Sequence, residues 1–254
     1  MYLVKIIMRL VEYEITKKLL GITIFLLSAT PIISYILWIL DGCDPIFPYI
    51  SDLDLQPSAG LIFTLGYSIC GVLLSINGFQ IAAMRGIWME NNNLERKWII
   101  INRLSIIPSI VSGICLSWIA FTPWDEDLRL HLIQANFIFF GSIAWAIITI
   151  IITFRISEEN RDFATLINKR VSYTTLSIIG LIGMIERVYK YLQISPEYLD
   201  IDSRTGFISG SCVALDEKLL TQSAVFEWMY VVGTILLIST FFGEIKILSS
   251  GTKD

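Results

Sequence analysis

Long apolar stretches separated by short polar segments dominate the pattern of this chain. A helix needs about 20 apolar residues to cross a hydrocarbon core about 30 Å thick. Because backbone groups in hydrocarbon must find partners within their own segment, each such stretch is expected to be α-helical. The pattern predicts an all-α polytopic membrane protein, a bundle of six transmembrane helices. The predicted spans are residues 19–40, 59–83, 99–121, 132–154, 171–192 and 223–243.

The fifth span is the least apolar, because Glu186, Arg187 and Lys190 fall in its last turns. Without it, residues 155–222 would form one long segment with no regular structure, which compact proteins rarely tolerate. We therefore include it. The even number of spans places both termini on one side of the membrane.

The overall composition agrees with a membrane protein. Hydrophobic residues make up 54% of the 254 residues and charged residues 17%, with a mean hydropathy of +0.66. The net charge of −4 gives no support to a role with nucleic acid. The expected partners are membrane lipids, together with other membrane proteins that the apolar flanks of the bundle could contact.

Basic residues predict the orientation. Of the 19 Lys and Arg residues, the face that holds the first, third and fifth loops keeps five: Arg129, Arg187, Lys190, Arg204 and Lys218. By the positive-inside rule, both termini are predicted to be cytosolic. The expected location is the endomembrane system (lysosome, Golgi or ER) or the plasma membrane. Residues 1–18 are predicted to form an amphipathic segment in the cytosolic interface, with a simple cytosolic extension of the first span as the alternative, and residues 249–254 a short cytosolic tail.

The first loop carries the most specific local signal. Residues 44–52, Asp-Pro-Ile-Phe-Pro-Tyr-Ile-Ser-Asp, lie between two spans and are called the proline loop below. Pro45, Pro48 and the later Pro57 fix φ and favour extended geometry in the residues before them. The loop is therefore predicted to be rigid and to lie on the exoplasmic side.

Polar side chains at the same membrane depth form the candidate site. Ionisable residues inside spans are costly, so they are default candidates for function. The candidates are Asp52, His131, Glu186, Arg187 and Glu227. In one interpretation they are a structural cluster that pins the proline loop to the bundle. In the other they form a lipid headgroup site or, in an enzyme, an acid/base pair made by His131 and Glu227.

The four cysteines divide by location. Cys70 and Cys115 lie within spans, whereas Cys43 and Cys212 lie in exoplasmic loops and could form a disulfide in an oxidising compartment. One histidine and no Cys-x-x-Cys pair leave too few ligands for a metal site. No cofactor and no metal are predicted.

Three sequence features in register resemble a known family. Residues 45–52 of the proline loop, Pro57 before the second span, and Ser223-Ala224-Val225-Phe226-Glu227-Trp228 at the start of the sixth resemble the DRAM (damage-regulated autophagy modulator) family. Its wider group includes proteins of the fibroblast-growth-factor-receptor-activating type and GPI-anchor lipid-remodelling proteins. The resemblance runs from about residue 19 to 248, and His131 and Glu227 match the family's polar residues in the fourth and sixth spans.

The resemblance implies a non-enzymatic membrane regulator or scaffold, linked to autophagy and lysosomes or to phosphoinositide organisation. The departures also carry information. Pro57 is followed by Ser58 where autophagy-type members have glutamate, and residues 125–131 with Asn136-Phe137 look closer to the lipid-remodelling branch. The alternatives are a GPI-anchor lipid-remodelling enzyme or cofactor that uses His131 and Glu227, and an accessory subunit of a larger membrane complex.

Overall fold

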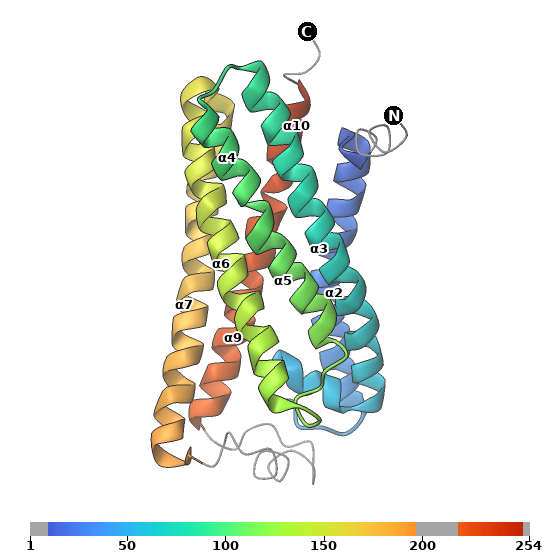
Figure 1. Ribbon diagram of the computed structural model, residues 1–254. Helices are drawn as coiled ribbons and strands as arrows, with labels where there is room; N and C mark the ends of the chain where they lie inside the picture. The colour runs from blue at the N-terminus through green and yellow to red at the C-terminus, as the bar shows by residue number, and fades with distance from the viewer. Residues whose placement is uncertain (1–9, 197–217, 251–254) are drawn as a thin grey trace.

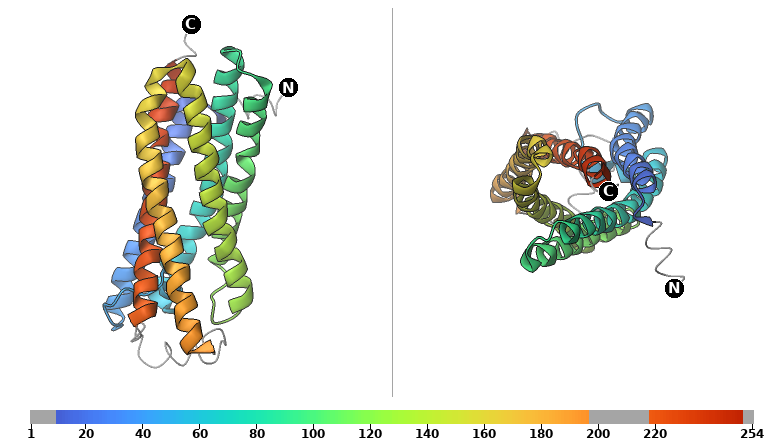
Figure 2. Two further views of the ribbon diagram at one scale, coloured as in Figure 1. Left: turned by 90° about the vertical axis from the view of Figure 1, so that its left-hand side faces the viewer. Right: turned by 90° about the horizontal axis from the view of Figure 1, so that it is seen from above.

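The computed structural model describes residues 10–196 and 218–250, which form a bundle of long helices (Figure 1 and Figure 2). The elements, in chain order, are α2 (Tyr13–Leu40), η1 (Ile50–Leu55), α3 (Pro57–Asn91), α4 (Arg96–Leu104), α5 (Ile106–Ile119), α6 (Leu128–Glu159), η2 (Arg161–Phe163), α7 (Ala164–Ile194), α9 (Lys218–Ser239) and α10 (Phe241–Ser250). Residues 1–9, most of the predicted interfacial segment, lie outside the described residues, as do 251–254 of the predicted tail.

Within the described residues, six helical stretches are long and apolar enough to cross a membrane. The prediction of an all-α bundle with six spans is therefore confirmed. The start of α2 and the end of α10 lie at the same end of the bundle, which we call the terminal end (Figure 1). The opposite end carries η1 and is called the η1 end. That the terminal end faces the cytosol stays a prediction.

The third span is made of two helices, α4 and α5, which meet at Ser105. Pro108 lies in the first turn of α5 and has no N–H to donate to the carbonyl of Leu104. The helical hydrogen-bond ladder is therefore interrupted just before the proline. The sixth span is also divided, into α9 and α10, at Thr240.

Small residues bring two helix pairs into close contact. A Cβ atom at Gly71 of α3 would collide with the backbone of Gly113 in α5, and one at Gly180 of α7 would collide with the backbone of Tyr230 in α9. Such positions let helix backbones approach closely in a membrane, where packing replaces the hydrophobic effect as the driving force. The bundle thus contains two tightly packed pairs, α3 with α5 and α7 with α9.

The outer surface is apolar. Phe25 is 65% exposed, Leu61 61% and Ile182 61%, on three different helices. In water such a surface would promote aggregation, whereas in a bilayer these side chains contact lipid tails. The surface is that of an integral membrane protein.

Candidate functional site

The proline loop is fixed to the bundle by side chains that donate to its backbone. The hydroxyl of Tyr35 donates to the carbonyl of Pro45 at 2.7 Å, and the indole of Trp228 donates to the carbonyl of Pro48 at 2.9 Å. The ring of Phe47 stacks on Tyr35 and meets Trp228 edge-on, with ring centres 5.5 and 5.7 Å apart. Because proline removes backbone donors, the loop is held through its carbonyls and rings, as its sequence requires.

Asp52 holds the other half of the loop. Its carboxylate accepts a hydrogen bond from the backbone N–H of Tyr49 at 3.1 Å and one from the indole of Trp124 at 3.0 Å, and the residue is only 2% exposed. The first bond closes the turn that begins η1, and the second ties that turn to the segment between α5 and α6. Asp52 is therefore a brace between two loops.

Glu227 and His131 each contact loop backbone as well. The Glu227 carboxylate accepts from the N–H of Ile50 at 2.7 Å. Nδ1 of His131 lies 2.7 Å from the carbonyl of Thr122, and since a carbonyl only accepts, this contact places a proton on Nδ1. Both residues are buried, at 8% and 4% exposure. The two candidate groups thus help to hold the loops of the η1 end.

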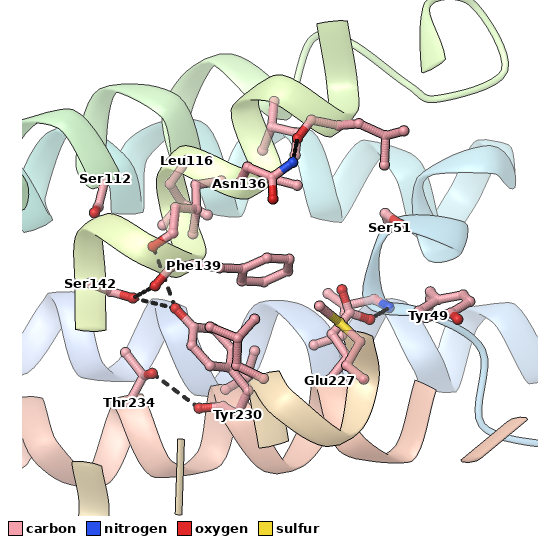
Figure 3. A pocket seen from close by; sticks show the side chains of 18 of the residues that line it. Tyr49, Ser51, Ser112, Leu116, Asn136, Phe139, Ser142, Glu227, Tyr230 and Thr234 are labelled. Carbon is pink, nitrogen blue, oxygen red and sulfur yellow. Dashed lines mark hydrogen bonds between the residues drawn. The ribbon is translucent and has the colours of Figure 1, made fainter. Parts of the chain in front are cut away.

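A cavity of about 430 Å³ lies beneath these loops, inside the bundle (Figure 3). Its η1 end is lined by Tyr49, Ile50 and Ser51 of the loop, with His131 and Glu227 beside them. The walls below are formed mainly by apolar side chains of α3, α5, α6, α7 and α9. The proline loop therefore covers a cavity, and the two polar side chains lie at its polar end.

Farther from the η1 end, the cavity wall carries a group of hydroxyls. Ser142 of α6 and Tyr230 of α9 are hydrogen-bonded to each other, and the hydroxyl of Thr234 donates to the carbonyl of Tyr230 at 3.0 Å (Figure 3). Figure 3 shows Phe139 between this group and Glu227. Because the hydroxyls bond to one another and to backbone, this end presents few free polar atoms to a ligand.

Four lining residues are exposed on the surface of the bundle: Leu132 and Asn136 of α6, and Ile185 and Tyr189 of α7. All the others are buried or partly buried. The two helices lie side by side at the terminal end and farther apart toward the η1 end (Figure 1). The cavity therefore opens sideways, between α6 and α7, toward the lipid.

Glu186 and Arg187 take a different position from the one predicted. Glu186 forms ion pairs with Arg187, at 3.2 Å, and with Lys190, all on α7. Ile185 and Tyr189 face the cavity, so by helical periodicity Glu186 and Lys190 point to another side of the helix. The structure brings Asp52, His131 and Glu227 to one end of the bundle and leaves this pair on the outside of α7.

The cysteines are partly described. Cys70 and Cys115 are free thiols within spans, and Cys43 is disulfide-bonded. Cys212 lies outside the described residues, so its pairing with Cys43 stays a prediction. Among the described residues, no group of three or more His, Cys, Asp or Glu side chains could hold a metal ion.

Asp54 has an unusual environment in η1, outside the spans. Burial raises the pKa of its carboxyl from 3.8 to about 7, and the negative charges of Asp125 and Glu126 add to this, while a hydrogen bond from Thr64 opposes it. The group therefore titrates near neutral pH. Asp52, two residues away, points instead to Trp124.

A second buried cluster, which sequence reasoning missed, lies at the terminal end. Glu244 of α10 accepts from Arg85 of α3 at 2.5 and 2.8 Å and from Arg170 of α7 at 2.6 Å, and all three side chains are fully buried. Both guanidinium groups lie over the ring of Phe241, 5.5 and 4.9 Å from its centre. Arg170 also donates to the hydroxyl of Thr240 at 2.9 Å. We call Arg85, Arg170 and Glu244 the charged triad.

A signal for the triad was present in the sequence. Glu244 directly follows the predicted end of the sixth span, at the depth where Arg85 and Arg170 border the second and fifth. Under the positive-inside rule these two arginines count as charges of cytosolic loops. Loop residues are expected to be exposed, so the burial of the two arginines is not predicted. A lone carboxylate facing two arginines at one depth is a pairing signal.

The fold and site define a class: a six-span helical membrane protein with a loop-covered cavity that opens to the lipid. The model of the Frag1/DRAM/Sfk1/Cwh43P N-terminal domain family matches residues 18–248, and the chain belongs to this family. The resemblance to the DRAM family is thereby confirmed. Comparisons with curated proteins and with solved structures give no match.

Proposed function

We propose that this protein is a non-enzymatic, lipid-binding membrane regulator, which takes a lipid of the leaflet next to the η1 end into its cavity. The observation that carries this proposal is the cavity itself, apolar, about 430 Å³ in volume, and open to the membrane between α6 and α7. Its size falls in the range of small-molecule sites, and its walls match the chemistry of a lipid tail.

The contacts of His131 and Glu227 give both residues a role that needs no chemistry. Each uses one polar atom to hold a loop, through Thr122 and Ile50. Such contacts orient a side chain in binding sites and in catalytic sites alike. Both residues therefore fit a role in shaping the polar end of a binding site.

In the cell, we propose that lipid occupancy controls an activity linked to autophagy and lysosomes or to phosphoinositide organisation. The family membership supports this link. The exposed apolar faces of the bundle offer a surface through which the loaded and empty forms could contact another membrane protein.

Lipid binding is tested by purifying the full chain in mild detergent and measuring retained lipids by native mass spectrometry. We expect one lipid per chain to survive conditions that strip loosely bound lipid. Recovery of lipids in the proportions of the bulk membrane, with no defined stoichiometry, would refute the proposal.

The regulatory role is tested in cells that lack the protein. The wild-type chain should restore autophagic flux or phosphoinositide distribution, and so should His131→Ala and Glu227→Gln variants that reach the same membrane at the same level and still retain lipid. Failure of correctly located, lipid-retaining variants to restore function would contradict a non-enzymatic role.

A second candidate function is the remodelling of GPI-anchor lipids. One observation favours it: His131, Glu227 and Ser51 all line the same lipid-accessible cavity. This candidate predicts that His131→Ala changes the lipid composition of GPI-anchored proteins while leaving the protein folded. An unchanged composition in a folded variant eliminates it.

A further inference from the structure

The cavity has a defined length. On three helices the lining residues span twelve positions, which are eleven steps along the helix: His131 to Ser142 on α6, Leu181 to Leu192 on α7, and Glu227 to Ile238 on α9. At 1.5 Å per residue, each wall is about 16 Å long. This equals about half of the 30 Å hydrocarbon core, which is the depth of one leaflet.

The cavity volume limits what can enter. A methylene group is similar in size to a water molecule, whose share of liquid volume is about 30 Å³. A cavity of about 430 Å³ therefore holds roughly 14 methylene groups. This is one acyl chain, and two chains side by side would need about twice the volume.

The entrance has the shape that a single chain needs. The exposed lining residues Leu132 and Asn136 on α6 and Ile185 and Tyr189 on α7 form the two sides of a lateral opening. The proline loop closes the cavity toward the η1 end, where it is held by Glu227, Trp228 and Asp52. A chain can thus pass sideways from the bilayer between the helices, while a headgroup is kept out by the loop.

We propose that the cavity binds one acyl chain of a membrane lipid, of about 14 carbons, which enters between α6 and α7 while the headgroup and any second chain stay outside. This inference rests on the proposed function and adds the ligand class and the entry route. On α6 the lining ends at Ser142, whereas on α9 it continues past Thr234 to Ile238. The length of these walls sets the length of chain that fits.

The test uses the full chain in phosphatidylcholine nanodiscs with two photoreactive probes. One is a lysophosphatidylcholine with a single diazirine chain of about 14 carbons, and the other is a two-chain phosphatidylcholine with a diazirine in each chain. After illumination, mass spectrometry identifies the labelled peptides and counts the labels per protein. Single-chain probes of about 10, 18 and 22 carbons complete the series.

Two pairs of variants report on the site. Ala135→Phe fills the cavity, and Ala144→Phe makes the same change on an exposed position of α6. Leu132→Trp narrows the entrance, and Ile133→Trp changes the neighbouring exposed residue, which does not line the cavity. Because Leu132 and Ile133 are both on the surface, this second pair stays informative if Ala135→Phe fails to fold.

We expect both probes to label the lining peptides of α6, α7 and α9 with one label per protein. Labelling should fall about fivefold in Ala135→Phe and in Leu132→Trp and stay within about twofold of wild type in the controls. It should also fall for single chains longer than about 18 carbons.

Four results would overturn the inference, and they fall into two groups. Two labels from one two-chain lipid in the same cavity, or equal labelling by all chain lengths, would overturn the single-chain inference and leave lipid binding intact. Absence of any label on the lining peptides, or equal loss in variants and controls, would overturn the proposed function as well.

Discussion

The two ends of the bundle solve the problem of buried polar groups in opposite ways. At the terminal end, the carboxylate of Glu244 is fully buried between Arg85 and Arg170 and is held by three short charge-assisted bonds. At the η1 end, Glu227 and Asp52 accept from neutral backbone and indole N–H groups beside an open cavity. The first arrangement resists opening, because separating the charges would leave them unpaired in a dry interior. The second can open at lower cost.

This difference has a mechanical consequence. The charged triad joins α3, α7 and α10, so the two tightly packed helix pairs are connected at the terminal end. We therefore expect any movement that admits a lipid to take place in the η1 half, where α6 and α7 are farther apart (Figure 1). We expect the terminal end to serve as a fixed support and the η1 end as the part that responds to lipid.

The largest effect is expected from the charged triad. Glu244→Gln leaves two buried guanidinium groups without their carboxylate, at a cost of about 3 to 5 kcal/mol. Thermal unfolding in detergent should show a large loss of stability or no folded protein at all. Glu95→Gln removes the exposed pair with Lys97 and serves as the control with no measurable change. A melting temperature for Glu244→Gln equal to that of wild type would contradict the stabilisation of the terminal end by the charged triad.

The next effect concerns the indole that holds Asp52. Trp124→Phe keeps most of the ring packing and removes the donor, so a buried carboxylate loses a partner, which costs about 1 to 3 kcal/mol. The matched control is Trp118→Phe, because Trp118 is 53% exposed on the outside of α5. The melting temperatures of the two variants are compared in the same detergent. Equal decreases would contradict a stabilising role for the bond between Trp124 and Asp52.

A smaller effect is expected from the hydrogen bond between Glu227 of α9 and the backbone of the proline loop. Glu227→Gln keeps an oxygen that can accept from Ile50 and loses only the charge, so we expect a loss of about 1 kcal/mol. Glu227→Ala removes the acceptor and should cost more. Hydrogen exchange at the Ile50 amide reports directly on this hydrogen bond. Unchanged protection of that amide in Glu227→Ala would contradict a stabilising role for the bond.

The last effect is a pH dependence that originates in Asp54. The folded state holds the Asp54 proton up to about pH 7, whereas the unfolded chain releases it near 3.8. Between these values the folded state binds more protons, so stability falls as pH rises through this window. Asp54→Asn should flatten the dependence of melting temperature on pH in this range. An equally steep dependence in the variant would exclude Asp54 as its source.

Much of the fold could be predicted from the sequence, because hydropathy and span length act locally. The weak fifth span is part of α7, a continuous helix of 31 residues, and its polar last turns extend the helix past the apolar stretch. The proline loop was also recognisable, since its prolines restrict the backbone whatever surrounds it.

The site could be predicted only in part. Membrane depth placed Asp52, His131 and Glu227 at one end, but depth does not fix rotation about a helix axis. That rotation decides that Ile185 faces the cavity while Glu186 pairs on the outside of α7. The cavity and the charged triad depend on which helices are neighbours, and one sequence does not specify this.

In the proposed arrangement, the η1 half holds a lipid chain while the terminal half stays closed. A structure of the full chain determined in lipid nanodiscs tests this arrangement most directly. We expect one elongated density about 16 Å long between α6 and α7, ending near Ser142, with the charged triad intact. Side chains of α6 and α7 packed together, with no space left between Leu132 and Ile185, would contradict it.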